Sequence, residues 1–180
     1  QKLIPATLEL GGKSANIFFE DCKWDMAMDG LQMGILFNQG QVCCAGSRVF
    51  VQDSIYDKFV EEAVKRFNAV KVGPSWDHET QMGSQIDEGQ LKKILDYVEI
   101  GKQEGATVAC GGVRADEGAL AKGCFMRPTL LTNVTNDMRV AQEEIFGPIM
   151  PILTYDSLDE LIHKINSMPH PLALYFFTRD

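Results

Sequence analysis

Residues 15–51 decide the fold, and they read ANIFFE DCKWDMAMDG LQMGILFNQG QVCCAGSRVF V. The apolar run at 15–19 is typical of a buried strand, and apolar side chains then recur at helical spacing over 24–36. A short polar loop follows, and residues 49–51 are apolar again and predict a second strand. This order of strand, helix and strand indicates an α/β layer with a mainly parallel sheet.

The same alternation continues to the end of the chain. Further helices are expected at 54–67, 90–104 and 157–165, and further strands at 107–110, 125–131, 149–155 and 172–177. We expect Ser54, Asp21 and Ser157 to cap the helices that follow them. Gly105 is expected to end the helix before it. Pro128 indicates an edge or irregular position for its strand.

Composition excludes several classes of function. The chain has 180 residues, with 45% hydrophobic and 23% charged, as in a single globular domain. The net charge of -8 provides no basic surface for nucleic acid and disfavours anionic membranes. No signal peptide or long apolar run is present. The five cysteines include no C-x-x-C pair, so we predict no metal site, reduced thiols and a cytoplasmic location.

Two adjacent thiols, Cys43 and Cys44, lie in the polar loop between the helix and the second strand. A thiolate is the strongest common nucleophile near neutral pH, so one of these thiols could attack a carbonyl carbon. The alternative is that both are core residues, because free cysteine is among the most buried residue types. The polar, glycine-containing run before them favours the nucleophile, as does the helical turn that residues 43–47 permit.

Glu9 lies between two leucines and is followed by Gly11 and Gly12. A carboxyl group enclosed by apolar neighbours holds its proton more readily, which suits a general base. The alternative, favoured when this segment is taken alone, is that Glu9 pairs with Lys13 or points to solvent. The two glycines are too few for a phosphate-binding loop.

Residues 142–148, QEEIFGP, form a third candidate segment. A carboxylate beside a turn can accept hydrogen bonds from ribose hydroxyls, and an aromatic side chain can pack on a flat ring. The alternative is a solvated acidic helix end, with Phe146 in the core. Taken alone, this segment favours the alternative.

The histidines, His78, His163 and His170, are all distant from Cys43 in sequence. Spacing leaves a Cys-His protease open, because such partners meet only in the fold. Surface positions are nevertheless expected for all three.

Taken together and in this order, the three segments resemble the aldehyde dehydrogenase superfamily. They read LELGGKS at 8–14, NQGQVCCAGSR at 38–48 and EEIFGP at 143–148, with weaker support from QMGSQI at 81–86 and RPT at 127–129. The resemblance covers essentially the whole chain. It implies an α/β fold of the catalytic-domain type, a three-layer mainly parallel sheet with flanking helices. Residues 171–175 resemble a different branch of the superfamily, which leaves the subfamily and the aldehyde open.

The resemblance implies a role for each matched residue. Cys43 would be the nucleophile and Glu9 the general base. Glu144 would bind the nicotinamide ribose, and Phe146 would lie beside the nicotinamide. Gly11 would let the backbone approach the cofactor closely.

The implied reaction oxidises an aldehyde to a carboxylic acid with NAD or NADP. Cys43 would carry a thiohemiacetal and then a thioester, which water activated by Glu9 would hydrolyse. The oxyanion would be held by the backbone N–H of Cys43 and a side-chain amide. Val42 and Cys44 would line the substrate pocket.

The resemblance also implies how the chain is organised. Residues 1–180 are expected to be a catalytic domain truncated at both ends, with the Rossmann cofactor domain absent from this chain. A homodimer or homotetramer is expected, acting on a small-molecule aldehyde, and the isolated chain is expected to be inactive. Two alternatives remain: a CoA-acylating relative, against which the presence of Glu9 argues, and an inactive folded fragment.

Overall fold

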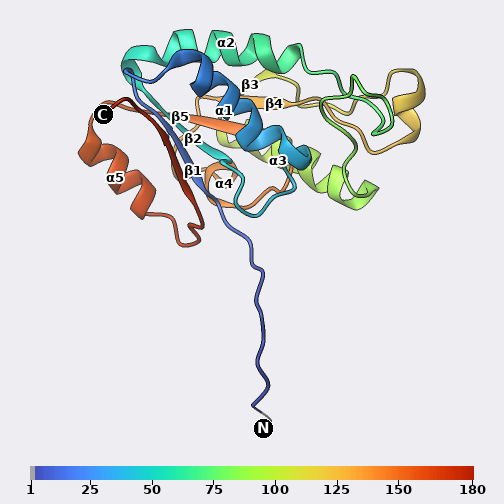
Figure 1. Ribbon diagram of the computed structural model, residues 1–180, viewed down its shortest axis with the longest axis horizontal. Coiled ribbons are helices and arrows are strands. Elements are labelled where there is room, and N and C mark those ends of the chain that lie inside the picture. Colours follow the sequence, from blue (N-terminus) through green and yellow to red (C-terminus); the bar gives the residue numbers. More distant parts are fainter. Residues whose placement is uncertain (1–2) are drawn as a thin grey trace.

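A computed structural model describes residues 3–180, which form a six-stranded sheet with helices on both faces (Figure 1). The helices are α1 (Trp24–Leu36), α2 (Tyr56–Asn68), α3 (Glu88–Glu104), α4 (Arg139–Gln142) and α5 (Leu158–Asn166). The strands are β1 (Ala15–Phe18), β2 (Arg48–Gln52), β3 (Thr107–Cys110), β4 (Thr129–Thr132), β5 (Ile149–Tyr155) and β6 (Leu174–Phe177).

The strand order is β3-β4-β5-β2-β1-β6, and only the pair β3 and β4 is antiparallel. The parallel strands β1 and β2 are joined by α1, as the sequence of residues 15–51 predicts. The α/β fold with a mainly parallel sheet is therefore confirmed.

Alternate side chains of the sheet enter two separate cores. On β2, Val49 and Val51 pack in the cluster that includes α1 and α2, whereas Phe50 packs in the cluster that includes α3, α4 and α5. This alternation follows from the pleat of a strand, whose successive side chains point to opposite faces. A sheet with both faces covered gives the three layers that were expected.

Of the four helix-capping residues predicted from the sequence, two cap their helices in the structure and two do not. Ser157 accepts a hydrogen bond from the Glu160 amide, and Gly105 ends α3 in the left-handed conformation, as predicted. The cap at Ser54 was wrong, because its hydroxyl donates to Glu20 and α2 begins at Tyr56, after a short 3-10 turn. The cap at Asp21 was also wrong: α1 begins after Lys23, and the Asp21 carboxylate accepts hydrogen bonds from the Thr178 hydroxyl and the Arg179 amide.

Pro128 has the irregular one of the two positions predicted for it, not the edge one. β4 begins one residue later, at Thr129, and lies inside the sheet between β3 and β5. The proline therefore removes no hydrogen bond from the ladder. The edges of the sheet are β3 and β6.

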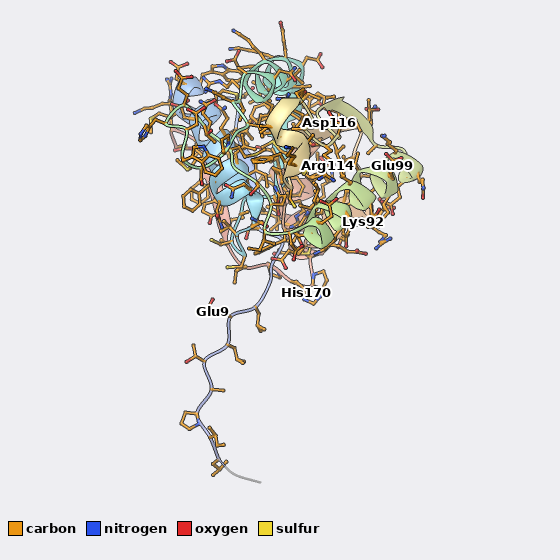
Figure 2. All side chains as sticks on the ribbon, turned by 90° about the vertical axis from the view of Figure 1, so that its right-hand side faces the viewer. Glu9, Lys92, Glu99, Arg114, Asp116 and His170 are labelled. Carbon is orange, nitrogen blue, oxygen red and sulfur yellow. The ribbon has the colours of Figure 1, made fainter. Side chains whose placement is uncertain are left out.

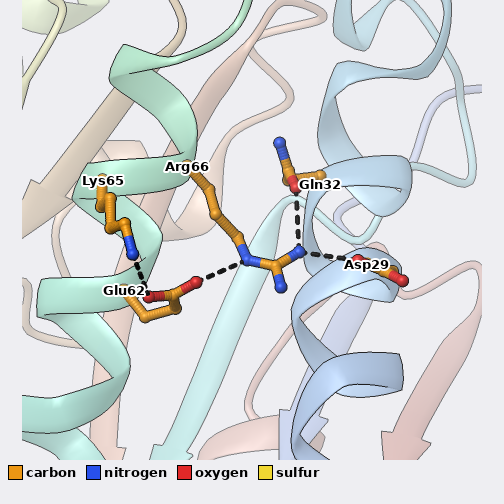
Figure 3. A network of polar contacts seen from close by, with 5 residues as sticks. All are labelled: Asp29, Gln32, Glu62, Lys65 and Arg66. Carbon is orange, nitrogen blue, oxygen red and sulfur yellow. Dashed lines mark hydrogen bonds and ion pairs between the residues drawn. The ribbon is translucent and has the colours of Figure 1, made fainter.

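Two arginine side chains form hydrogen bonds between a helix and a neighbouring element. Arg66 on α2 donates to Asp29 and Gln32 on α1, and its Nε lies 2.9 Å from Glu62 (Figure 3). Arg48 at the start of β2 is buried and donates to the carbonyls of Lys164 and Ile165, in the last turn of α5. The Lys164 carbonyl also accepts from the Ser167 hydroxyl and the Ile165 carbonyl from the Met168 amide, so Arg48 adds a further, charged donor to each and joins the end of α5 to β2.

Within residues 3–180, no helix combines the length and apolar content that crossing a membrane requires.

Candidate active site

The backbone before Cys43 takes an unusual course. Asn38, Gln39 and Gly40 have φ of 46°, 58° and 73°, so three consecutive residues are left-handed. The first two pay a steric cost that only glycine avoids. At Gly40 a Cβ would lie 2.3 Å from the carbonyl carbon of Gly147, so glycine is required there. The loop is thus packed directly against the segment that contains Glu144 and Phe146.

Cys43 and Cys44 form the centre of a tight turn. The Ala45 amide donates to the Val42 carbonyl at 3.1 Å, which closes the turn, and the Gly46 amide donates to the Gly34 carbonyl on α1. The helical turn considered from the sequence is not formed. No acceptor among residues 3–180 takes the amide hydrogen of Cys43, which leaves that N–H available to an oxyanion.

The two thiols border different cavities. Cys43 lines a cavity of about 510 Å³. The other residues of its wall are Glu9, Leu10, Gly11, Asn38, Gln41, Val42, Glu144 and Phe146. Cys44 instead lines a cavity of about 360 Å³ with mainly apolar walls, and only Val42 belongs to both. The structure therefore gathers Glu9, Cys43 and Glu144 around one space and places Cys44 outside it.

Glu144 is held close to the N-terminal segment. The Gly12 amide donates to its Oε1 at 3.2 Å. A Cβ on Gly11 would lie 2.1 Å from its Oε2, so only glycine leaves the carboxylate room. The neighbouring Glu143 is saturated by Arg139 and Tyr97, whose hydrogen bonds lower the pKa of Glu143 to about 2. Of the two acids, Glu144 is the one that lines the cavity.

Phe146 has a strained backbone and a half-exposed ring. Its φ is 61°, and its ring lines the Cys43 cavity rather than the core, so the core alternative was wrong. A bulky residue at positive φ persists only where neighbours hold it. Here Gln90 on α3 donates to the carbonyls of Ile145 and Phe146, at 3.2 and 2.7 Å. Lys93, one turn further along α3, reaches the Glu144 carbonyl at 3.4 Å.

Sequence reasoning did not identify Gln90 and Lys93. Both reach backbone carbonyls more than 50 residues away, and no motif in the helix marks them. Their spacing of three residues places them on one face of α3, which is the only sequence feature that could have suggested a shared role.

Glu9 lies on an extended segment that leads away from the body of the molecule (Figure 2). It is exposed, and so are Leu8 and Leu10, which therefore do not enclose its carboxylate as the sequence suggested. It does not pair with Lys13, whose Nζ is buried without a hydrogen-bond partner. Burial and the neighbouring Arg48 lower the pKa of Lys13 to about 7, against the opposite effect of Glu144 and Glu143.

The other candidate groups lie elsewhere. His78, His163 and His170 are exposed, and none lines the cavity of either thiol, so the Cys-His protease has no support. All five cysteines are free. Across residues 3–180, no three His, Cys, Asp or Glu side chains are grouped to hold a metal ion.

Comparisons with known proteins agree with the resemblance seen in the motifs. The profile described as the aldehyde dehydrogenase family matches residues 1–180. Human mitochondrial aldehyde dehydrogenase is 47% identical over 175 residues, covering 97% of this chain and 33% of that protein. Human retinal dehydrogenase 2 is 47% identical over 174 residues, with the same coverage.

Solved structures show the same likeness. An aldehyde dehydrogenase from Bacillus cereus, solved as an NAD+ complex, has a TM-score of 0.91 and 46% identity over 96% of this chain and 34% of its own. Betaine aldehyde dehydrogenase from Staphylococcus aureus, also with NAD+, has a TM-score of 0.94 and 41% identity over the same shares. The chain thus spans about a third of the length of the relatives it matches.

The prediction of a cytoplasmic location was wrong. Relatives from human, hamster and rat that cover 97% of this chain are named as mitochondrial. Free thiols indicate reducing surroundings, but they do not distinguish one reducing compartment from another.

Proposed function

The chain belongs to the aldehyde dehydrogenase family, and from that premise we propose that the protein oxidises an aldehyde to a carboxylic acid with NAD. The observation that supports this most is the single cavity walled by Cys43, Glu9, Glu144 and Phe146. The relatives are about three times as long as this chain. The reaction is therefore proposed for a longer protein that contains these 180 residues together with the regions that the relatives have in addition. The cofactor-binding domain is proposed to be among those regions.

The residues present fit a nicotinamide cofactor. Glu144 offers a carboxylate to ribose hydroxyls, and the absence of a Cβ at Gly11 lets the carboxylate take this position. The ring of Phe146 is available to a flat heterocycle, and Gln90 fixes its backbone. When bound, the cofactor supplies an acceptor for hydride. Two similar structures were solved with NAD+, which supports NAD rather than NADP.

The chain's own groups account for the covalent steps. The Cys43 thiolate adds to the aldehyde carbon, and the thiohemiacetal oxygen is stabilised by the free N–H of Cys43. Loss of hydride from that carbon leaves a thioester on the sulfur. Glu9 then takes a proton from water, the resulting hydroxide attacks the thioester, and the acid departs as the Cys43 thiolate is restored. Glu9 lines the cavity and is exposed, so it can exchange its proton with solvent.

Hydrolysis is favoured over transfer to CoA. A carboxylate that borders the same cavity as the thiol can activate water, whereas an acyl-transferring enzyme needs no base at this point. Val42 and Cys44 are proposed to lie on the aldehyde side, because both line the apolar cavity. We also propose that the protein assembles as a homodimer or homotetramer. The 180-residue chain alone is proposed not to oxidise aldehydes.

The test is cysteine labelling of the full-length protein. It is treated with limiting iodoacetamide, with and without NAD, and the modified cysteine is mapped by mass spectrometry. We expect preferential labelling of Cys43 at a rate that NAD changes. Cys22 and Cys110 should react slowly, since burial raises the pKa of both thiols, that of Cys110 to about 11. Equal labelling of Cys22, Cys110 and Cys124 would refute the assignment.

Two variants complete the test. Cys43→Ala should abolish aldehyde oxidation, with a loss of at least about a thousandfold in turnover, because the covalent route is removed. Cys44→Ala is the comparison variant: its thiol borders the other cavity, so it should keep the covalent route and its kcat, with any change confined to the KM for the aldehyde. Activity that survives in Cys43→Ala and disappears in Cys44→Ala would reverse the assignment of the nucleophile.

A further inference from the structure

Tyr175 lies on the edge strand β6, where it pairs with Asn16 of β1. Its hydroxyl donates a hydrogen bond of 3.0 Å to the carbonyl of Cys44, 131 residues earlier in the chain. Within residues 3–180, no other side chain hydrogen-bonds to the turn formed by residues 42–45. A residue at the border of the sheet therefore contacts the peptide that follows the two thiols.

The carbonyl that Tyr175 holds belongs to the peptide between Cys44 and Ala45. The N–H of the same peptide, on Ala45, donates to the Val42 carbonyl, and the next amide, on Gly46, donates to Gly34. Both polar groups of this peptide are therefore hydrogen-bonded, one to the backbone of the turn and one to Tyr175. Without the Tyr175 hydroxyl, only the Ala45 N–H would hold the peptide, and the turn that carries Cys43 and Cys44 could change its shape more readily.

The chemistry of Tyr175 suits a permanent donor. Burial raises the pKa of Tyr175, and the neighbouring Cys44 side chain adds to this effect, so the phenol stays protonated at neutral pH. Its ring lines the apolar cavity together with Phe37 and Cys44. One side chain thus forms part of a cavity wall and holds the turn from which the thiols project.

We propose that Tyr175 is a positioning residue for Cys43: its hydroxyl fixes the Cys44 peptide so that Cys43 faces the cavity of Glu9 and Glu144 while Cys44 faces the apolar one. The proposal rests on the proposed function, because it assigns Tyr175 to the orientation of the proposed nucleophile. It predicts that the hydroxyl, and not the ring, decides which thiol reacts.

The experiment compares Tyr175→Phe with the wild type in the full-length protein. This change keeps the ring and removes only the donor. Phe176→Leu is the matched control, because Phe176 is the next residue on the same strand and lines a groove away from the thiols. Three quantities are measured: the ratio of Cys43 to Cys44 alkylation by iodoacetamide, the pH profile of Cys43 alkylation, and kcat and KM for aldehyde and NAD.

We expect Tyr175→Phe to lower the Cys43 to Cys44 labelling ratio about tenfold and kcat by about the same factor, with the KM for NAD unchanged. Phe176→Leu should leave the ratio as in the wild type. A purely structural role for Tyr175 would lower the unfolding temperature of Tyr175→Phe without moving the ratio or the pH profile, and that result overturns the proposal. If the wild type itself shows no preference for Cys43, the proposed function fails first, so the two failures are distinguishable.

Discussion

The backbone amide of Gly12 donates a hydrogen bond to Oε1 of Glu144, which lies 132 residues further along the chain. This contact joins the segment that carries Glu9 to the connection between α4 and β5. It holds the carboxylate from one side, while the bare Cα of Gly11 leaves space on the other. The position of Glu144 is therefore set by backbone, and its remaining acceptor sites face the cavity.

Gly11→Ala should weaken NAD binding with little effect on stability. Its Cβ would lie 2.1 Å from Oε2 of Glu144, and a carboxylate at the end of a flexible side chain would swing away. A lost hydrogen bond to a charged group predicts about a tenfold rise in the Kd for NAD, measured by calorimetry. Gly83→Ala is the matched control, because its Cβ meets only Gln39 at ordinary contact distance. An unchanged Kd in Gly11→Ala would contradict the role given to Glu144.

Gln90→Leu should loosen the backbone around Phe146. The variant removes both hydrogen bonds to the carbonyls of Ile145 and Phe146, one of them 2.7 Å long. We expect a loss of about 1–2 kcal/mol in the free energy of unfolding, together with weaker NAD binding. Lys92→Ala is the control, since Lys92 is exposed on the same helix (Figure 2) and its ammonium group pairs with Asp96 at the surface. Equal losses of unfolding free energy in the two variants, measured by chemical denaturation, would argue against a stabilising role for the two Gln90 hydrogen bonds.

Lys13 should make the stability of the protein depend on pH. Its pKa is about 7 when folded against 10.5 as a free side chain, with burial as the main cause. The unfolded chain therefore binds more protons between these values, so the contribution of Lys13 improves as pH rises through that window. Below the folded pKa the penalty is fully present, and it amounts to a few kcal/mol at about 1.4 kcal/mol per pKa unit.

The measurement is the difference in unfolding free energy between Lys13→Met and the wild type. The variant has no ammonium group to bury, so it should be relatively more stable near about pH 6 than near about pH 10. Groups common to both proteins, such as Arg48, Glu143 and Glu144, cancel in this difference to first order. If the unfolding free energies of the two proteins depend on pH in the same way, burial does not lower the pKa of Lys13.

The two arginines should differ in their contribution to stability. Arg48→Met removes two buried hydrogen bonds from a charged donor to the carbonyls of Lys164 and Ile165, and we expect a loss of about 2 kcal/mol. Arg66→Met removes contacts to Asp29 and Glu62 at the surface, where about 1 kcal/mol or less is expected. Urea denaturation at low and high salt separates the cases, because only the Arg66 effect should shrink with salt. A strong salt dependence for Arg48→Met would contradict its burial.

Periodicity in the sequence was enough to predict the elements whose apolar faces are continuous. Residues 24–36 show helical spacing from Trp24 to Leu36, and α1 has these bounds. The failures came from side chains with distant partners. Asp21 and Ser54 have the residue types of helix caps, yet their oxygens are engaged by Thr178 and Glu20. Local propensity does not record such competition.

The candidate site shows the same division. The motifs around Glu9, Cys43 and Glu144 pointed to one centre, and the fold gathers these residues at one cavity. The supporting residues Gln90, Lys93 and Tyr175 carry no motif, because each acts through a backbone carbonyl elsewhere in the chain. Only the tertiary structure identifies which carbonyl a side chain reaches.

The left-handed run at Asn38, Gln39 and Gly40 links backbone strain to the position of the proposed nucleophile. Glycine at the first two positions would relieve the positive φ, but it would remove the hydrogen bonds that the side chains of Asn38 and Gln39 donate to the carbonyls of Gln41 and Ser84. The same change would let the backbone ahead of Cys43 sample many conformations, which a preorganised nucleophile does not tolerate. Glycine at Asn38 or Gln39 is therefore expected to lower turnover even where the stability of the fold is unchanged.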